Sequence, residues 1–351
     1  MKKSILLITV IITVLSMLTL VLLSGCKTAA EETTAETTAA AETTAAAETT
    51  AAAAGPVKIF LNTGDLLSEF AFSLHAGALK AATEAGNVEL TKDASESGNV
   101  DENVSILEQA IAAKYNGIIL MPYVADAFEE PIKKANEAGI PVATWHTRPV
   151  DDTVAIGYAG PDQIDYAEQS AMWIAEKMGG KGKVQILFYG SSDQERLISK
   201  AFQDKMKEQY PEITVVEDIG TGDPAKTAEV ITNRILSDPD INGFVGFAAY
   251  YSNTMAKVAE EQGILDKVSI LGIDILKSNL DDLKAGKIQG IIDQGSFKSG
   301  YVCVNMILNY LKDGNTGYDK FYVHPTKIVT MDDIAEYQEI VDSTINLMEG
   351  K

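Results

Sequence analysis

The chain has 351 residues, of which 46% are hydrophobic and 23% are charged. A chain of this length has room for two domains of ordinary size, each with its own core. Acidic residues outnumber basic ones by 50 to 29, which gives a net charge of −21 at pH 7. Such a negative protein is repelled by nucleic acids and by anionic lipid surfaces. We therefore expect no nucleic-acid partner.

The first 25 residues have the pattern of a secretory signal peptide. A basic start at residues 1–3 is followed by an apolar run at residues 5–23 and by small residues before Cys26. The apolar run is also long enough to be a transmembrane helix. The sequence LSGC at residues 23–26 favours the signal, because it resembles the processing site of bacterial lipoproteins. That resemblance implies cleavage before Cys26 and a lipid on its side chain.

Residues 26–54 consist of Cys26 and a tract that is almost entirely alanine, threonine and glutamate. Because no large apolar residue follows the cysteine, this segment has nothing to bury and is predicted to be a disordered spacer. A flexible chain of this length spans roughly 30 Å on average. Cleavage would leave 27 basic and 50 acidic residues, a net charge of −23.

From residue 57 onward, short apolar runs alternate with amphipathic stretches of helical period. Strands are predicted at residues 57–61, 88–90, 117–121, 141–145, 154–158, 184–188, 213–216, 243–247, 269–273 and 290–292. Helices are predicted at residues 70–85, 103–114, 127–138, 164–178, 196–209, 225–236, 253–262 and 297–311. Parallel strands need such crossover helices, so the pattern predicts an α/β fold of two doubly wound, Rossmann-like lobes. A cleft between two lobes suits a small ligand.

Two polar residues end neighbouring strands of the second predicted lobe. Asp274 follows the run at 269–273, and Gln294 follows the run at 290–292. Between them we expect a short helix with acidic residues near its start. The carboxyl ends of parallel strands converge on a ligand crevice, so both side chains are predicted to point into one cleft. Asp274 could instead cap the short helix, and the residues alone leave both interpretations open.

Other chemistry has little support in the sequence. The three histidines are scattered and form no set with metal-ligand spacing. Cys303 lies on an apolar helix face and is expected in the core; if Cys26 carries lipid, no internal disulfide is possible. The glycine-rich residues 179–182 lack the Ser or Thr that a phosphate loop needs after its Lys. We expect no metal, no cofactor and no enzymatic activity.

Six segments carry a family likeness: residues 70–78 (FAFSLHAGA), 138–145 (AGIPVATW), 210–216 (YPEITVV), 237–240 (SDPD), 271–274 (LGID) and 327–337. In their order and spacing they resemble the periplasmic sugar-binding proteins of the ribose-binding type, which are the substrate-binding components of ABC transporters. The resemblance implies a hinge of three strands, with crossings near residues 160–162, just after Gln294, and near residues 324–326. It implies an N-terminal lobe of residues 56–160 and 295–323, and a C-terminal lobe of residues 162–294 and 326–351.

The resemblance also implies ligand contacts. An aromatic residue in the first helix corresponds to Phe70, beside Ser68, while Asp274 and Gln294 match the family's polar contacts. Carboxylate and amide groups can pair with adjacent sugar hydroxyls, and an aromatic face can cover the apolar side of a sugar ring.

Other positions depart from the family pattern. Where the family has an Asp-Arg pair, this chain has His146 and Thr147, with Arg148 next and Trp145 before. A Trp here is similar to the branch that binds autoinducer-2 or rhamnose. Trp145 and His146 could also belong to the core, although strand ends beside a turn usually face the cleft.

Two further departures affect the other wall of the cleft. A family Arg is replaced by Ile198, with Arg196 nearby as a substitute, and the usual Asn-Asp pair is replaced by two alanines before Tyr250. The ribose-specific set is broken, and ribose itself is not expected. The predicted ligand contacts are Ser68, Phe70, Trp145, His146, Arg148, Arg196, Tyr250, Asp274 and Gln294.

These features together predict a monomeric extracytoplasmic protein, lipid-anchored to the outer face of the cytoplasmic membrane. It would capture a small polyhydroxylated ligand and deliver it to the permease of an ABC transporter. The alternative is a protein that presents its ligand, of the autoinducer-2 type, to a membrane sensor or chemoreceptor.

Overall fold

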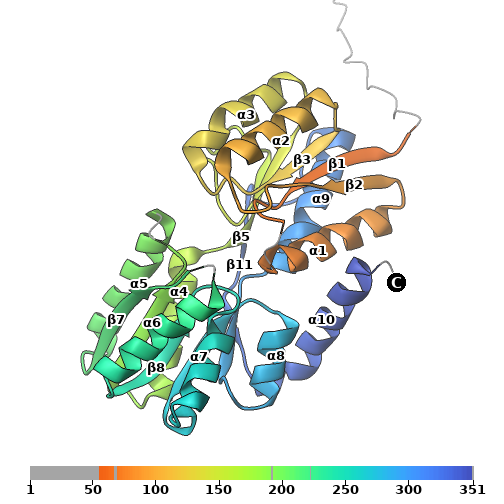
Figure 1. Cartoon of the computed structure of the whole chain (residues 1–351). Helices are drawn as coiled ribbons and strands as arrows, with labels where there is room; N and C mark the ends of the chain where they lie inside the picture. The colour runs from red at the N-terminus through yellow and green to blue at the C-terminus, as the bar shows by residue number, and fades with distance from the viewer. Residues whose placement is uncertain (1–54, 67–68, 191–192, 222, 350–351) are drawn as a thin grey trace, which may run out of the picture. The chain divides into compact units, whose positions relative to one another are not determined.

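The computed structural model describes residues 55–66, 69–190, 193–221 and 223–349. The predicted signal peptide, Cys26 and the spacer lie outside these residues, and so does Ser68. The described part of the chain folds into two lobes, each built on a six-stranded sheet with helices on its faces (Figure 1).

The first sheet has the strand order β11-β5-β4-β3-β1-β2, and all its neighbours are parallel. Its strands are β1 (Val57–Asn62), β2 (Val88–Lys92), β3 (Gly117–Leu120), β4 (Val142–Trp145), β5 (Gly157–Pro161) and β11 (Phe321–His324). One apolar cluster joins the sheet to α1 (Phe70–Ala85) and α9 (Ser296–Asp313). Another joins it to α2 (Val100–Ala112) and α3 (Ala125–Glu137). The two clusters lie on opposite faces, as a doubly wound lobe requires.

The second sheet has the order β12-β10-β9-β8-β6-β7 and is parallel except for the edge pair of β10 with β12. Its strands are β6 (Gly182–Phe188), β7 (Ile213–Ile219), β8 (Ile241–Gly246), β9 (Ser269–Ile273), β10 (Gly290–Asp293) and β12 (Lys327–Val329). Helices α4 (Gln163–Lys177) and α5 (Asp193–Gln209) share one core cluster with it. Helices α6 (Pro224–Ser237), α7 (Tyr251–Glu261), α8 (Lys277–Lys284) and α10 (Ile334–Met348) share the other.

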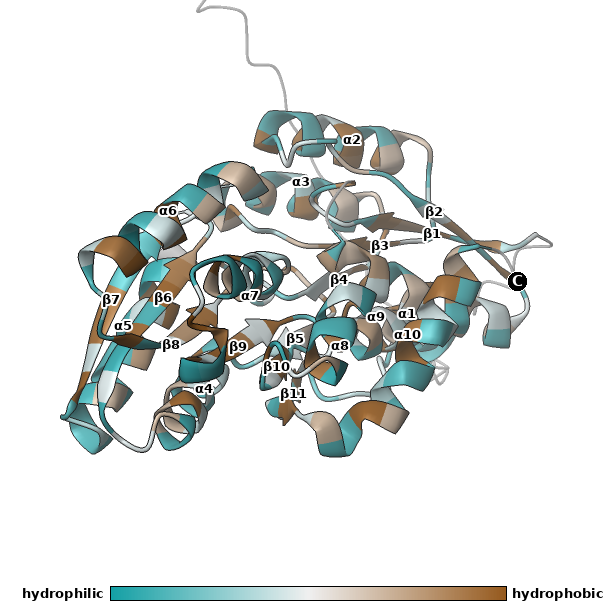
Figure 2. Ribbon diagram, turned by 60° about the horizontal axis from the view of Figure 1, so that its bottom comes forward, coloured by the Kyte–Doolittle hydropathy of each residue, from teal (hydrophilic) through white to brown (hydrophobic). Residues whose placement is uncertain are grey.

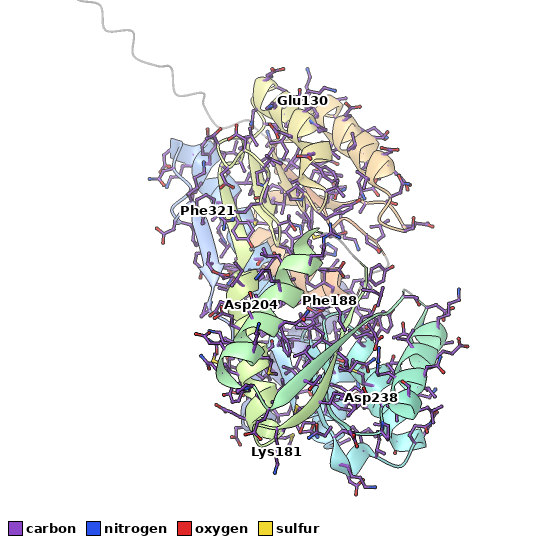
Figure 3. The ribbon with its side chains drawn as sticks, turned by 90° about the vertical axis from the view of Figure 1, so that its left-hand side faces the viewer. Glu130, Lys181, Phe188, Asp204, Asp238 and Phe321 are labelled. Carbon is purple, nitrogen blue, oxygen red and sulfur yellow. The ribbon has the colours of Figure 1, made fainter. Side chains whose placement is uncertain are left out.

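Burial explains why these segments form strands and helices. Strands covered by helices on both faces must be apolar throughout, and all four residues of β3 and of β4 are buried. Figure 2 shows hydrophobic central strands and helices whose outer surfaces are hydrophilic. Charged residues such as Glu130 and Asp204 are exposed, whereas Phe188 at the end of β6 is buried (Figure 3).

The chain passes between the two sheets three times, from β5 to α4, from β10 to α9 and from β11 to β12. At the second passage, α9 packs tightly on α1 because both helices carry glycine at the contact. A Cβ on Gly77 would lie 1.8 Å from the carbonyl oxygen of Phe297, and a Cβ on Gly300 would lie 2.0 Å from that of Leu74. This close approach brings the start of α9 against the second turn of α1.

The structure corrects several local predictions. The strand predicted at residues 154–158 lies at β5, three residues later, and β11 and α10 were not predicted. Helix α8 begins at Lys277 and has no acidic residue in its first turn, so the prediction of acidic residues near its start was wrong. Cys303 is fully buried and unpaired, as expected of a core residue.

Candidate functional site

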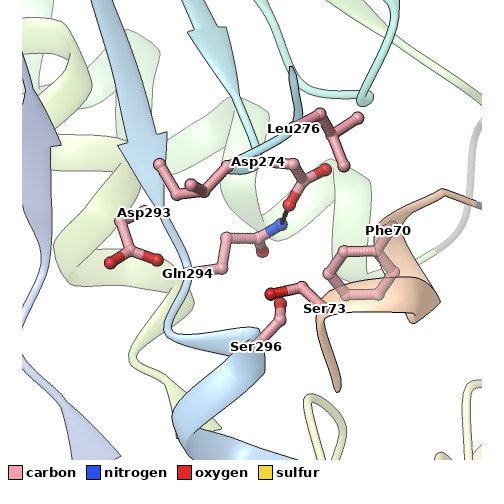
Figure 4. A pocket seen from close by; sticks show the side chains of 8 residues that line it. Phe70, Ser73, Asp274, Leu276, Asp293, Gln294 and Ser296 are labelled. Carbon is pink, nitrogen blue, oxygen red and sulfur yellow. Dashed lines mark hydrogen bonds between the residues drawn. The ribbon is translucent and has the colours of Figure 1, made fainter. Parts of the chain in front are cut away.

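A small pocket lies where α1 and α9 begin and where β9 and β10 end (Figure 4). Its volume is about 10 Å³, room for about one water molecule. The residues that line it are Phe70, Ser73, Asp274, Ile275, Leu276, Asp293, Gln294 and Ser296. The pocket therefore combines three of the predicted contacts, Phe70, Asp274 and Gln294, with residues from both lobes.

Asp274 is the most constrained polar residue of this pocket. Its backbone has a positive φ of 73°, and it is only 6% exposed. Its carbonyl oxygen accepts a hydrogen bond of 2.9 Å from the side-chain amide of Asn279, on α8. The backbone therefore has a fixed, uncommon conformation that sends the carboxylate into the pocket. Non-glycine residues in this region are often functional.

The Asp274 carboxylate and Gln294 meet directly. Gln294 Nε2 donates a hydrogen bond of 2.8 Å to Asp274 Oδ1, shown as a dashed line in Figure 4. Burial raises the pKa of Asp274 to about 7, and the Gln294 hydrogen bond opposes this rise only in part. Removal from water disfavours the charged carboxylate, because a single neutral donor replaces its hydration shell.

The alternative role for Asp274, as a helix cap, is wrong for the described structure. The N-cap of α8 is Leu276, and no side chain caps that end of the helix. Asp274 lies two residues before that position. Its carboxylate is directed at Gln294 instead.

The aromatic side of the site is a cluster of three rings. The centroid of Phe70 lies 5.3 Å from that of Trp145 and 5.0 Å from that of His146. Trp145 is 1% exposed and packs in the core of the first lobe, with Nε1 3.4 Å from the carbonyl oxygen of Asn62. Phe70 thus faces the pocket, and Trp145 packs against Phe70 from the core of the first lobe. Of the two roles that the sequence left open for Trp145, the structure shows the core role. A direct ligand contact by Trp145 stays a prediction.

His146 follows β4 with a positive φ of 59°. Its carbonyl oxygen accepts hydrogen bonds from Tyr158 Oη at 3.2 Å and Gln163 Nε2 at 3.1 Å. Burial lowers the pKa of its imidazole to about 4, so the ring is neutral at physiological pH. It lies against Phe70, and it is not among the residues that line the pocket.

The structure does not bring the remaining predicted contacts to the pocket. The guanidinium of Arg148 is exposed and lies 4.7 Å from the ring centroid of Phe321. Tyr250 donates its hydroxyl hydrogen to the carbonyl oxygen of Thr221. Arg196 is exposed on α5. None of these three predicted contacts lines the pocket, and their roles in binding stay predictions.

Two hydroxyl groups of the pocket were not predicted. Ser73 lies three residues after Phe70, which places both on one helix face, and Ser296 is the first residue of α9. The helical spacing from Phe70 could have identified Ser73. Ser296 follows Gln294 by two residues, at the passage into the first lobe.

A wider groove of about 410 Å³ adjoins the pocket between α1, α8 and α10. The two spaces share Ser73, Ile275 and Leu276 in their walls. The groove also contains Lys277 and Asp281, whose side chains form an ion pair of 2.5 Å. The pocket is therefore next to a larger space on one side.

The described residues form neither a metal site nor a membrane-spanning helix. They contain no group of three or more His, Cys, Asp or Glu side chains that could hold a metal ion. Within the same part of the chain, no helix has the length and apolar character needed to cross a membrane.

Comparison with known proteins identifies this architecture. The profile of the periplasmic binding protein domain matches residues 59–316. The chain belongs to this family. The relatives include binding proteins for xylose/arabinose and for D-apiose. These matches confirm the resemblance to the ribose-binding type and the predicted two-lobe α/β fold. The family consists of extracytoplasmic binding proteins, not enzymes.

Three similar proteins illustrate the relationship. The xylose/arabinose-binding protein of Sulfolobus acidocaldarius is 24% identical over 260 residues, 69% of this chain and 63% of that relative, just under two thirds of its length. The xylitol-binding protein of Mycolicibacterium smegmatis is 25% identical over 76% of this chain and 78% of its own. The crystal structure of a glucose-galactose binding protein from Geobacillus stearothermophilus has a TM-score of 0.69 at 26% identity, covering 79% of this chain and 98% of its own.

Proposed function

We propose that this protein captures a sugar or sugar-like molecule between its two lobes and delivers it to the permease of an ABC transporter. The observation that carries this proposal is the buried pair of Asp274 and Gln294 opposite Phe70. Carboxylate and amide groups exchange hydrogen bonds with neighbouring hydroxyls, and the aromatic ring offers an apolar face. The sugar-binding activities of the relatives support the same ligand class.

The ligand would hold the two walls of the pocket together. Phe70 and Ser73 belong to a helix of the first lobe, whereas Asp274 and Gln294 end strands of the second. A volume of about 10 Å³ is too small for a sugar ring, so entry requires these walls to separate. A ligand that contacts both walls then stabilises the closed arrangement, which is a population shift toward the state it binds better.

The lobe boundaries follow from this mechanism. We place the N-terminal lobe at residues 56–160 and 295–323 and the C-terminal lobe at residues 162–294 and 326–351, so that the hinge lies at the three passages between the sheets. Gln294 lies next to one of these passages. Its side chain would therefore link occupancy of the pocket to hinge closure.

The anchor is a separate part of the proposal. The LSGC sequence at residues 23–26 supports lipid attachment at Cys26, and the spacer would hold the folded part clear of the membrane. Cys26→Ala should abolish lipid attachment and leave the ligand affinity unchanged. Detergent partitioning and mass spectrometry of the wild-type protein test this, and an unlipidated wild-type chain would end the anchor proposal.

A thermal-shift screen tests the binding function. Pentoses, hexoses, deoxysugars, sugar alcohols and autoinducer-2 would be added to the purified folded part, and each hit would be confirmed by calorimetric titration. A ligand at a hundred times its dissociation constant stabilises the folded state by roughly 2.7 kcal/mol, a shift that is easily measured. Absence of binding to every member would contradict the proposal. Binding of autoinducer-2 alone would favour the sensor alternative.

A further inference from the structure

The Asp274 carboxylate has far fewer hydrogen-bond donors than it can accept. An ionised carboxylate offers about four acceptor positions, and Gln294 Nε2 is the one side-chain donor that the described residues give it. The group is only 6% exposed, so water supplies little of the remainder. A ligand with several donors would therefore gain most by contacting this carboxylate.

The second carboxylate of the pocket is already satisfied by the protein. Asp293 Oδ1 accepts the backbone N–H of Gly295 at 2.8 Å, and Oδ2 accepts the hydroxyl of Tyr337 at 2.9 Å. Burial raises the pKa of Asp293, and the two hydrogen bonds and Lys327 oppose that rise only in part. Asp293 thus adds negative charge near the pocket without offering the same free acceptor positions.

No cation balances Asp274 among the described residues that line the pocket, which include no Lys, Arg or His. In the adjoining groove, Lys277 is paired with Asp281, and Glu69 adds another acidic side chain. Behind Phe70, burial keeps the His146 imidazole neutral by lowering its pKa, and near Asp274 burial raises the pKa of the Tyr166 phenol on α4, so that it is uncharged too. The surroundings of Asp274 are therefore neutral or acidic.

We propose that the ligand of this site is an amino-polyol, with a protonated amine placed against the Asp274 carboxylate. This inference rests on the proposed function and specifies its ligand class. An ammonium group provides three donors and a compensating charge, and charge-assisted hydrogen bonds are about twice as strong as neutral ones. Ser73, Gln294 and Ser296 would bind the hydroxyl groups, and Phe70 would cover the apolar face.

The same arrangement disfavours acid sugars. A ligand carboxylate in this pocket would meet Asp274 and Asp293 with no described cation on the lining to offset the repulsion. Like charges in a partly desolvated site raise each other's pKa instead of pairing. Uronates and aldonates should therefore bind poorly, whatever their stereochemistry.

Matched sets of ligands test the proposal by calorimetric titration. One set is galactose, galactosamine and galacturonate; the other is sorbitol, glucamine and gluconate, which share a skeleton and differ in one group. At about pH 7.5, where Asp274 is mostly ionised, the amino member should bind at least roughly tenfold tighter than the neutral member. The carboxylate member should show no measurable binding.

The pH dependence provides a second readout. Glucamine keeps its charge between about pH 7.5 and pH 5.5, because an aliphatic amine resembles lysine in its pKa. Pairing with Asp274 requires the ionised carboxylate, so lowering the pH through 7 forces proton release on binding. The affinity for glucamine should fall by up to roughly tenfold per pH unit, whereas the affinity for sorbitol should not.

Two variants test whether the Asp274 carboxylate itself, and not the negative charge of the region as a whole, produces the preference for the amino member. Asp274→Asn keeps the shape and tolerates positive φ, and it should abolish the preference for the amino member and its pH dependence. Glu69→Gln, in the adjoining groove, removes a charge of the same sign while Lys277 stays paired with Asp281, and it should leave that preference intact. A neutral member that binds as tightly as its amino analogue, or an unchanged preference in Asp274→Asn, would overturn the inference. Neither result would contradict the proposed function, because the screen of neutral sugars tests that function separately.

Discussion

His146 and Asp274 occupy equivalent places in the two lobes, yet they do opposite things. Each follows a buried parallel strand, β4 or β9, and each has a positive φ. The carbonyl oxygen of each accepts side-chain hydrogen bonds, from Tyr158 and Gln163 in one lobe and from Asn279 in the other. The two strand ends thus share one backbone conformation but carry different side chains.

The difference lies in what surrounds the two side chains. His146 lies among aromatic rings, whereas Asp274 meets the amide of Gln294. Burial drives both groups toward their neutral forms, lowering the pKa of the base and raising that of the acid. The first lobe therefore gives the site an apolar surface, and the second gives it hydrogen bonds. Specificity for a ligand should depend mainly on the second lobe, and stability of the site on the first.

The largest effect should come from Trp145→Ala. The indole is fully buried behind Phe70, and truncation of a buried aromatic to alanine costs about 3–5 kcal/mol in the free energy of unfolding. Urea denaturation of the unliganded protein measures this cost. Phe70 loses its support at the same time, so ligand affinity should also fall.

Trp145→Phe is the matched control. It keeps an aromatic ring in the core and loses only the indole N–H near Asn62 and some volume, so most of the stability should return. A Trp145→Ala protein with wild-type stability and weakened affinity would show that the ring acts as a ligand contact and not as core.

The stability difference between each variant and the wild type should depend on pH with opposite signs at the two strand ends. Asp274 has a pKa of about 7 in the folded protein, above the value of 3.8 that is usual for an aspartate, so its protonated form stabilises the fold. That contribution is complete below the unfolded pKa and is lost as the pH rises through about 7. Asp274→Asn should thus gain stability relative to the wild type from pH 4 to 7, by at most about 4 kcal/mol.

The pKa of His146 is shifted in the opposite direction. Its pKa of about 4 in the folded protein lies below the value of 6.5 that is usual for a histidine, so the neutral ring stabilises the fold. This contribution is complete above the unfolded pKa and is lost as the pH falls through about 4. His146→Asn should therefore gain stability relative to the wild type as the pH is lowered. Urea denaturation of the wild type, Asp274→Asn and His146→Asn at several pH values measures how the free energy of unfolding of each variant, relative to the wild type, changes with pH. Changes of the same sign in the two variants would contradict the assignment.

Asn279 tests how the second strand end is held. Its side-chain amide donates to the carbonyl oxygens of Ile273, Asp274 and Ala249, and its oxygen accepts the Ser252 hydroxyl. Asn279→Ala removes a partner from each of these buried groups, at a cost of roughly 1–3 kcal/mol. Among the described residues, the Asp274 carbonyl oxygen keeps only the Leu276 N–H, at 3.0 Å, so Asp274 is held less firmly. Both stability and ligand affinity should fall.

Tyr158→Phe makes the corresponding change in the first lobe. It removes a hydroxyl that donates to the carbonyl oxygens of His146 and Pro161, while Gln163 still holds His146. The loss should be about 1 kcal/mol, with little effect on affinity. Equal losses of affinity in Asn279→Ala and Tyr158→Phe would contradict the division of roles between the lobes.

The sequence predicted the parts of this site that follow from chain periodicity. Apolar runs and their crossover helices gave the two sheets, and the convergence of strand ends brought Asp274 and Gln294 together. Trp145 shows a limit of the strand-end argument. It is the last residue of β4 itself, and it shares with Ala143 the face that packs against α1 and α9. Side chains alternate between the faces of a strand, so the residue after Trp145 is the one that leaves the sheet.

Other features depend on long-range contacts that the local pattern does not contain. Strand β11 is only four residues long and pairs with β5, more than 150 residues earlier in the chain. Helix α10 is rich in apolar residues, but only two of them, Tyr337 and Val341, are buried, and they pack in the core of the second lobe. Arg148 and Tyr250 were predicted as contacts because they lie next to positions that contact the ligand in the resembled family. In the structure Arg148 lies against Phe321, and the Tyr250 hydroxyl donates to the carbonyl oxygen of Thr221.

The smallest predicted effect concerns the shared backbone conformation. At positive φ an L-residue with a Cβ is strained by roughly 1–2 kcal/mol, and glycine escapes this cost. In the unliganded protein, His146→Gly should therefore be more stable than His146→Ala, and Asp274→Gly more stable than Asp274→Ala, each by about 1 kcal/mol after the entropy cost of glycine. Comparing glycine with alanine removes the side-chain interactions from both members, so each difference reports the backbone alone. Similar differences at the two positions would show that both strand ends carry the same strain. If glycine and alanine were equally stable at position 274 while glycine were more stable at position 146, the turn at Asp274 would relax once its side chain is lost. The hydrogen bond between the carboxylate and Gln294 would then be what holds that turn in its strained conformation.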